Sequence, residues 1–166
     1  MFCRLLFTTF GNDVRIWNLE KFASYGRLSA ATHSSRSEVT CLEFLDGANP
    51  RVFTGSRDHY VKLYQITPDG TGFFEASNNL ATHYDSVTSV VAYGNSLFSS
   101  SKDMNIMRFS LEDLKRDHIE LQAHSNWIQS MCVLDTYRPL LATACRGGRV
   151  KVWDITSTRK LRLVDE

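Results

Sequence analysis

The sequence has few of the residues that mark secreted, metal-binding or membrane-spanning proteins. Its 166 residues include four cysteines and three prolines. The cysteines, at positions 3, 41, 132 and 145, form no Cys-X-X-Cys pair, so their spacing predicts neither a zinc site nor a redox motif. No apolar run approaches the roughly 20 residues of a membrane span, and no Asn-X-Ser/Thr acceptor occurs. These absences favour a reducing, intracellular compartment, free thiols and no membrane insertion.

Charge and sequence motifs also exclude several functions. Lysine and arginine number 19 against 18 aspartates and glutamates, for a net charge of +1, so no nucleic-acid partner is expected. The sequence contains no Gly-X-Ser-X-Gly elbow, His-Glu-X-X-His pair, EF-hand loop, dinucleotide fingerprint or Walker A loop. We therefore expect a protein that is not an enzyme and that has no catalytic residue, no metal site and no cofactor.

Four segments share one pattern, namely a strand of small residues, a tight turn and an alternating strand that ends in an aromatic residue. They read LLFTTFGNDVRIWN, RVFTGSRDHYVKLYQ, SLFSSSKDMNIMRFS and LLATACRGGRVKVWD. The closing aromatics at positions 17, 64, 109 and 153 are 47, 45 and 44 residues apart. A period of about 40–45 residues with four strands per repeat is typical of WD-repeat propeller blades, which these segments resemble.

A second pattern precedes three of these segments. His33, His83 and His124 are each followed by apolar residues at offsets of zero, three and five from the first, beginning at Val39, Val87 and Ile128. An offset of three breaks the alternation of a strand, so we expect a β-bulge near the start of this inner strand.

The repeats predict an all-β fold, a partial WD-repeat β-propeller of about three and a half blades out of an expected seven. The predicted blades cover about residues 1–31, 32–81, 82–122 and 123–166. The first begins at its second strand (about Leu5–Thr9), and a single helical turn is expected within Leu111–His118. Because the first blade has no inner strand, the chain is expected to be a fragment of a longer protein.

WD repeats contain a buried hydrogen-bond chain that runs from the histidine through a turn aspartate and a strand hydroxyl to the aromatic residue. The residues expected to form it here, as a structural blade network, are His33, Thr54, Asp58 and Tyr64, then His83, Ser99 and Asp103, then His124, Thr143 and Trp153. Phe109 cannot hydrogen-bond, and Gly147 takes the position of the aspartate in the last repeat. His83, Asp103 and Ser99 also form a catalytic-looking set, but their recurrence at the repeat period favours packing over catalysis.

Several stretches are similar to the C-terminal WD-repeat propeller of kinesin-4-type microtubule motors. They are GNDVRIWNLEKFASYGRLS, FTGSRDHYVKLY, HYDSVTS, AHSNWI and RPLLATACRGGRVKVW, together with the basic Arg108. The most specific element is CRGG, with Gly147 where a turn aspartate is usual. Thr32, Thr82 and Phe109 depart from the family pattern. The resemblance implies a non-catalytic protein-interaction scaffold in the tail of a cytoplasmic, cytoskeleton-associated motor. The ATPase motor and a dimerising coiled coil would then lie outside this fragment.

Two functions remain open from the sequence. The first is a motor-tail module that binds microtubules, motor cargo or both. The alternative is a generic WD-repeat adaptor of another complex, such as a ubiquitin-ligase substrate receptor or a trafficking scaffold.

One surface is predicted to bind the partner. The residue before each turn aspartate position is basic in three successive repeats, at Arg57, Lys102 and Arg146. Equivalent residues of a propeller fall on one face around the channel mouth, where Trp127 is also expected. Cations beside an exposed aromatic ring suit an acidic, extended partner, and the kinesin resemblance makes the acidic tails of tubulin the natural candidate.

Overall fold

The computed structural model describes residues 5–29, 37–47, 50–66, 73–77, 80, 82–157 and 160–166, which form fifteen strands in four antiparallel sheets. The first sheet contains β1 (Leu5–Phe10), β2 (Asp13–Asn18) and β3 (Ala23–Ser29). The second contains β4 (Val39–Leu45), β5 (Arg51–Ser56), β6 (Val61–Ile66) and β7 (Phe73–Ser77). The third contains β8 (Val87–Tyr93), β9 (Ser96–Ser101), β10 (Ile106–Ser110) and β11 (Arg116–Glu120). The fourth contains β12 (Ile128–Leu134), β13 (Leu140–Cys145), β14 (Val150–Asp154) and β15 (Arg162–Asp165).

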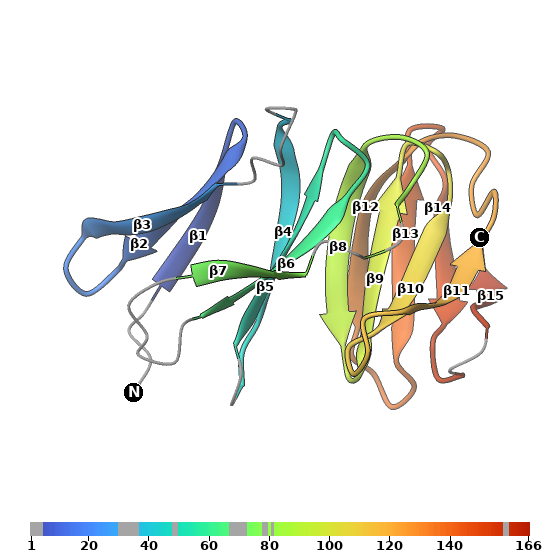
Figure 1. Cartoon of the computed structure of the whole chain (residues 1–166). Coiled ribbons are helices and arrows are strands. Elements are labelled where there is room, and N and C mark those ends of the chain that lie inside the picture. The colour runs from blue at the N-terminus through green and yellow to red at the C-terminus, as the bar shows by residue number, and fades with distance from the viewer. Residues whose placement is uncertain are drawn as a thin grey trace.

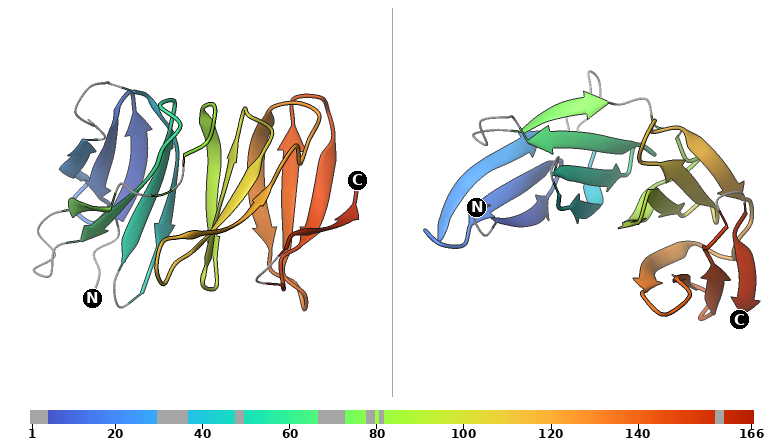
Figure 2. Two further views of the ribbon diagram at one scale, coloured as in Figure 1. Left: turned by 45° about the vertical axis from the view of Figure 1, so that its right-hand side comes forward. Right: turned by 90° about the horizontal axis from the view of Figure 1, so that it is seen from below.

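Each sheet is a blade whose strands pair in the order of the sequence (Figure 1). The four blades, numbered 1 to 4 along the chain, follow one another along an open arc (Figure 2). Strand β8 contacts both β4 and β12, so the first strands of blades 2, 3 and 4 are neighbours across the blade boundaries. The prediction of an all-β, blade-by-blade fold is confirmed.

The predicted bulge near the start of the inner strand is present in blades 2, 3 and 4. The pairing register shifts between Val39 and Cys41, between Val87 and Ser89, and between Ile128 and Ser130. A second shift was not predicted. In all four blades the register of the outermost pair changes immediately before the closing aromatic residue. Extra residues at both places increase the local twist of each blade.

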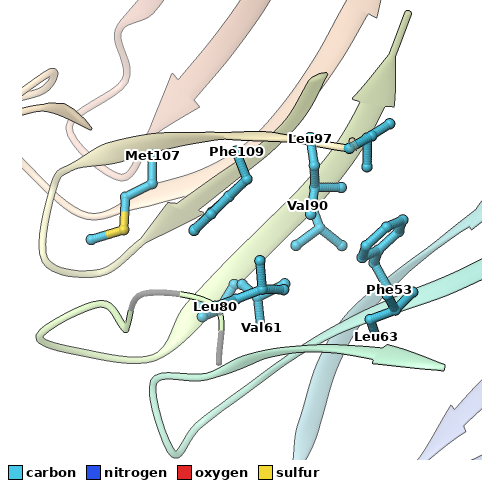
Figure 3. Packing of buried hydrophobic residues seen from close by; sticks show 10 residues of the cluster. Phe53, Val61, Leu63, Leu80, Val90, Leu97, Met107 and Phe109 are labelled. Atoms are coloured by element: carbon cyan, nitrogen blue, oxygen red, sulfur yellow. The ribbon is translucent and has the colours of Figure 1, made fainter. Parts of the chain in front are cut away.

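The core lies between the blades, because the two middle blades bury apolar side chains on both faces and the first and last blades bury them on the face toward their neighbour. Figure 3 shows the cluster between blades 2 and 3, in which Phe53 and Val61 pack against Val90, Leu97 and Phe109. Equivalent clusters join blade 1 to blade 2 and blade 3 to blade 4. Close-packed interiors of this kind are expected for repeats that cannot bury a core alone.

The segment after β10 contains a single turn, as expected within Leu111–His118. The amide of Leu114 donates to the carbonyl oxygen of Ser110 at 2.9 Å, which closes one helical turn. This turn occupies the first part of the range within which a single turn was expected, and strand β11 begins at Arg116. Pairing with β10 satisfies the backbone from that point and ends the turn.

Candidate functional site

Blade 3 contains a connected polar network beneath its b–c turn, the turn between its second and third strands. The Nδ1 of His83 donates to the Oδ2 of Asp103 at 2.9 Å, and its Nε2 lies 2.7 Å from the Ser99 hydroxyl oxygen. Asp103 also accepts from the amides of Tyr84 and Asn105. Burial acts to raise the pKa of Asp103, but the hydrogen bonds and the charge of His83 outweigh it and lower that pKa below its ordinary value. The network therefore holds an ionised carboxylate inside the blade.

The order Asp103, His83, Ser99 matches that of a hydrolytic triad, so its accessibility decides its role. The Ser99 residue has 0% of its surface exposed, and His83 has 3%. A nucleophile must be accessible to its substrate, and the Ser99 hydroxyl is buried. The arrangement instead satisfies polar groups that would each cost roughly 1–3 kcal/mol if buried without partners.

Blade 4 contains the same network without the acid. Thr143 is its centre, because its Oγ1 lies 2.8 Å from the Nε2 of His124 and accepts from the Nε1 of Trp153 at 2.9 Å. Gly147 occupies the position of Asp103 and offers no side chain. The Nδ1 of His124 is consequently buried with no hydrogen-bond partner among the described residues.

Blade 2 is described only in part, because His33 lies outside the described residues. Thr54 and Tyr64 are buried, with 1% and 3% of their surfaces exposed. Asp58 accepts hydrogen bonds from the Ser56 hydroxyl and the Tyr60 amide. Its other carboxylate oxygen lies 4.0 Å from the Nζ of Lys62, a buried lysine that the sequence pattern did not identify.

Blade 1 contains a pair that the sequence pattern missed. The Nε1 of Trp17 donates to the Oγ1 of Thr8 at 2.9 Å, as Trp153 does to Thr143. The two partners are nine residues apart in blade 1 and ten apart in blade 4. The cause is a shorter b–c turn, since Phe10 pairs directly with Asp13 across Gly11 and Asn12.

We predict that Gly147→Asp will raise the free energy of unfolding by about 1 kcal/mol, because it supplies the acceptor that His124 lacks. The site has room, since a Cβ at Gly147 would lie 3.5 Å from the Cβ of Asn126 and from the Sγ of Cys145, both ordinary contacts. Equilibrium denaturation in urea measures the change. Gly147→Ala is the matched control, because it adds the same Cβ without a carboxylate.

The pH dependence gives a second measurement of the same contact. Burial, and next the positive charge of Lys151, lowers the pKa of His124. As the pH falls below about 6.5, the unfolded chain therefore binds a proton at this histidine before the folded chain does, and stability is lost. A carboxylate at position 147 would favour the protonated ring and reduce this loss. Equal stability of the Asp and Ala variants at every pH would contradict the prediction.

A second candidate site is a hollow of about 330 Å³ on the face of the arc that carries the b–c turns, and residues of blades 2, 3 and 4 line it. Its lining includes Lys102 of blade 3 and Arg146 and Trp127 of blade 4. The Lys102 Nζ lies 4.9 Å, and the Arg146 guanidinium carbon 5.0 Å, from the centroid of the Trp127 ring. Trp127 keeps 40% of its surface exposed. Two cations from neighbouring blades thus share one aromatic surface that is open to a partner.

The bulges supply polar side chains to this hollow. Thr40, Thr88 and Gln129 are the extra residues at the three inner-strand bulges, and all three line it. The hydroxyl of Thr40 lies 2.5 Å from the carbonyl oxygen of Val87 in the next blade, and Thr88 contacts Ser100 within its own blade. The sequence pattern located the bulges without assigning these residues to the surface, although the offset of three was the signal.

Arg57 was predicted to join Lys102 and Arg146 in one ring of cations. All three occupy the same place in their blades, since each backbone amide donates to the carbonyl oxygen of the residue before the inner strand. Arg57, however, pairs with Glu38 at 2.9 Å and is not part of the lining of the hollow. The structure therefore gathers two of the three predicted cations around Trp127.

Other kinds of site are not found within the part of the chain that the structure describes. No group of three or more histidine, cysteine or acidic side chains there could hold a metal ion. No helix in these same ranges is long and apolar enough to cross a membrane. The described cysteines are free, and burial raises the pKa of the Cys41 thiol to about 11, which keeps it protonated.

Comparisons with known proteins agree with this architecture. The family described as "WD domain, G-beta repeat" matches residues 26–65 and 116–154. The computationally designed Ika4 protein superposes with a TM-score of 0.73 at 21% identity, over 93% of this chain and 88% of that one. The designed Ika8 protein superposes at 0.72 and 18% identity, over 97% of this chain and 46% of that one. These structural likenesses show the fold alone.

Three curated relatives are kinesin-like proteins. Kinesin-like protein klp-12 of Caenorhabditis elegans is 44% identical over 98% of this chain and 10% of its own length. KIF21B of Mus musculus is 34% identical over 91% of this chain, and KIF21A of Homo sapiens is 30% identical over 90%. In each of these two the match covers 9% of the relative. The chain thus spans about a tenth of the length of these relatives.

Proposed function

We propose that the chain, a WD-repeat protein similar to a short part of several kinesin-like proteins, is the protein-interaction scaffold in the tail of a kinesin-like motor. In this role it binds microtubules, motor cargo or both, and it carries out no catalysis of its own. The proposal implies a cytoplasmic, cytoskeleton-associated protein. The observation that carries it is the exposed hollow around Trp127, where two blades present Lys102 and Arg146 side by side.

The geometry supports binding rather than chemistry. The histidine networks are buried inside the blades, whereas the hollow around Trp127 is open and has no titratable pair with the spacing of an acid and a base. Exposed aromatic and arginine side chains are the residues that most often dominate protein–protein binding energy. Microtubules have an acidic surface, which suits a cationic face through long-range attraction.

Co-sedimentation with microtubules tests this function. We expect the chain to pellet with microtubules at about 0.1 M salt, where exposed charges still act over about 10 Å. Reversal of Lys102 and Arg146 to glutamate should reduce the bound fraction several-fold. The control is Arg116→Glu, which reverses an exposed charge on β11, away from the hollow. Equal binding by both variants would contradict the proposal, and no binding by the wild-type chain would favour a generic adaptor.

A further inference from the structure

The two cations of the hollow differ from Arg57, their counterpart in blade 2, in having no acidic partner. Arg57 pairs with Glu38 at 2.9 Å. Among the described residues, neither Lys102 nor Arg146 forms an ion pair. Both lie instead over the Trp127 ring, which carries no net charge. The hollow therefore has two uncompensated positive charges on one side, and an anionic group of a ligand would complement them.

The donors at this surface indicate which anion fits. Phosphate sites typically add several backbone amides to their cationic side chains. Here the amide of Lys102 donates to the Ser86 carbonyl at 3.0 Å, and that of Arg146 donates to the Trp127 carbonyl at 2.9 Å. The amides of the two cationic residues are thus already used. One guanidinium and one ammonium remain, a set that matches a carboxylate, which arginine can bind through two parallel hydrogen bonds.

The rest of the hollow suits an extended peptide. Trp127 offers a half-exposed ring on which an aliphatic stem can pack, next to the two charges. Gln129, at the bulge of β12, is exposed, and within the described residues its side-chain amide makes no hydrogen bond. This amide can both donate and accept, as the backbone of an extended peptide requires. Thr88 adds a hydroxyl from the neighbouring blade.

We infer that the hollow is a binding site for an acidic, extended peptide segment of the partner. A Glu or Asp carboxylate sits between Lys102 and Arg146, its stem packs on Trp127, and the peptide backbone bonds to Gln129. The inference rests on the proposed interaction function and specifies the chemistry of the ligand. It also assigns unequal roles to equivalent residues, because Lys102 and Arg146 bind the carboxylate whereas Arg57 remains paired with Glu38.

Fluorescence anisotropy tests the inference with a dye-labelled peptide of alternating Glu and Gly residues, added to the whole chain. The matched peptide has Gln at every Glu position. We expect the Glu peptide to bind and the Gln peptide not to bind. Lys102→Met and Arg146→Met should each weaken binding by about tenfold, the loss typical of a charged hydrogen bond. Arg57→Met removes the same charge from an equivalent position and should change the affinity by less than about twofold.

Three results would overturn the inference: equal binding of the two peptides, an equal effect of Arg57→Met, or tighter binding of a single-stranded oligonucleotide. The proposed function can fail separately. Microtubule binding without binding of the Glu peptide would refute only the ligand chemistry. Binding of the Glu peptide without binding to microtubules would leave the site intact and refute the microtubule proposal. Trp127→Leu, which retains an apolar side chain but removes the ring, should also weaken the binding of the Glu peptide.

Discussion

Replacement of Arg108 by alanine is expected to lower the free energy of unfolding by about 2–4 kcal/mol, the range for truncation of a large buried side chain. Arg108 has 1% of its surface exposed and links blade 3 to blade 4. Its Nε donates to Asp117 at 2.9 Å, and its Nη1 donates to the carbonyl oxygen of Ser157 at 2.5 Å. Truncation removes both bonds and leaves a cavity. Equilibrium unfolding in urea measures the loss.

Two variants separate the causes of that loss. Arg116→Ala removes an exposed arginine from the adjacent strand and should change stability by less than about 0.5 kcal/mol. Arg108→Leu fills the space with the kind of side chain found at the equivalent positions Ile16 and Leu63, which are buried. Leucine should recover part of the loss, since apolar groups often replace a buried ion pair at little cost. If alanine at position 108 proved harmless, Arg108 would not hold these blades together.

Replacement of Gly55 by alanine is expected to destabilise the chain by about 1–3 kcal/mol, as overpacking of a close-packed core does. A Cβ at this position would lie 2.5 Å from the Cγ1 of Val87, 2.9 Å from the Cβ of Val87 and 2.6 Å from the Sγ of Cys41. Strand β5 of blade 2 approaches β8 of blade 3 too closely for any side chain there. Thermal unfolding measures the effect, and Gly55→Val should be worse.

The matched control for this prediction is Gly26→Ala in β3, where a Cβ would meet nothing within 4 Å. Alanine there should be neutral or slightly stabilising, because it restricts the unfolded chain. The double variant Gly55→Ala with Val87→Ala should recover only part of the loss relative to Gly55→Ala, since it removes the methyl group at 2.5 Å but leaves the Cβ at position 87 and the Sγ of Cys41. A Gly55→Ala chain as stable as the Gly26→Ala chain would show that the two blades do not approach as described.

The fold could be predicted from the sequence because its evidence is repeated. A single break in alternation is weak evidence, but the same offset of three after His33, His83 and His124 predicted bulges that are present in three blades. The same reasoning failed in blade 1, because its b–c turn is one residue shorter than that of blade 4. The shorter turn moved Thr8 from its expected offset, so a hydrogen bond equivalent to that of Trp153 went unassigned.

The candidate site could be predicted only in part, because it depends on contacts between blades. The repeat pattern identified Arg57, Lys102 and Arg146 as equivalent, and equivalence is all that a repeat encodes. Whether each cation is free depends on the residue before the inner strand, which is Glu38 in blade 2 and Trp127 in blade 4. The buried role of Arg108 is of the same kind, since its bond to Ser157 crosses from one blade to the next.

Recognition of an acidic peptide by the hollow around Trp127 is open to a direct test on microtubules. Co-sedimentation of the wild-type chain with microtubules, before and after protease removal of the acidic tubulin tails, tests it most directly. We expect trimming to reduce the bound fraction to that of the Lys102→Glu, Arg146→Glu variant, so that trimmed microtubules no longer distinguish this variant from the wild-type chain. Undiminished binding of the wild-type chain to trimmed microtubules would contradict it.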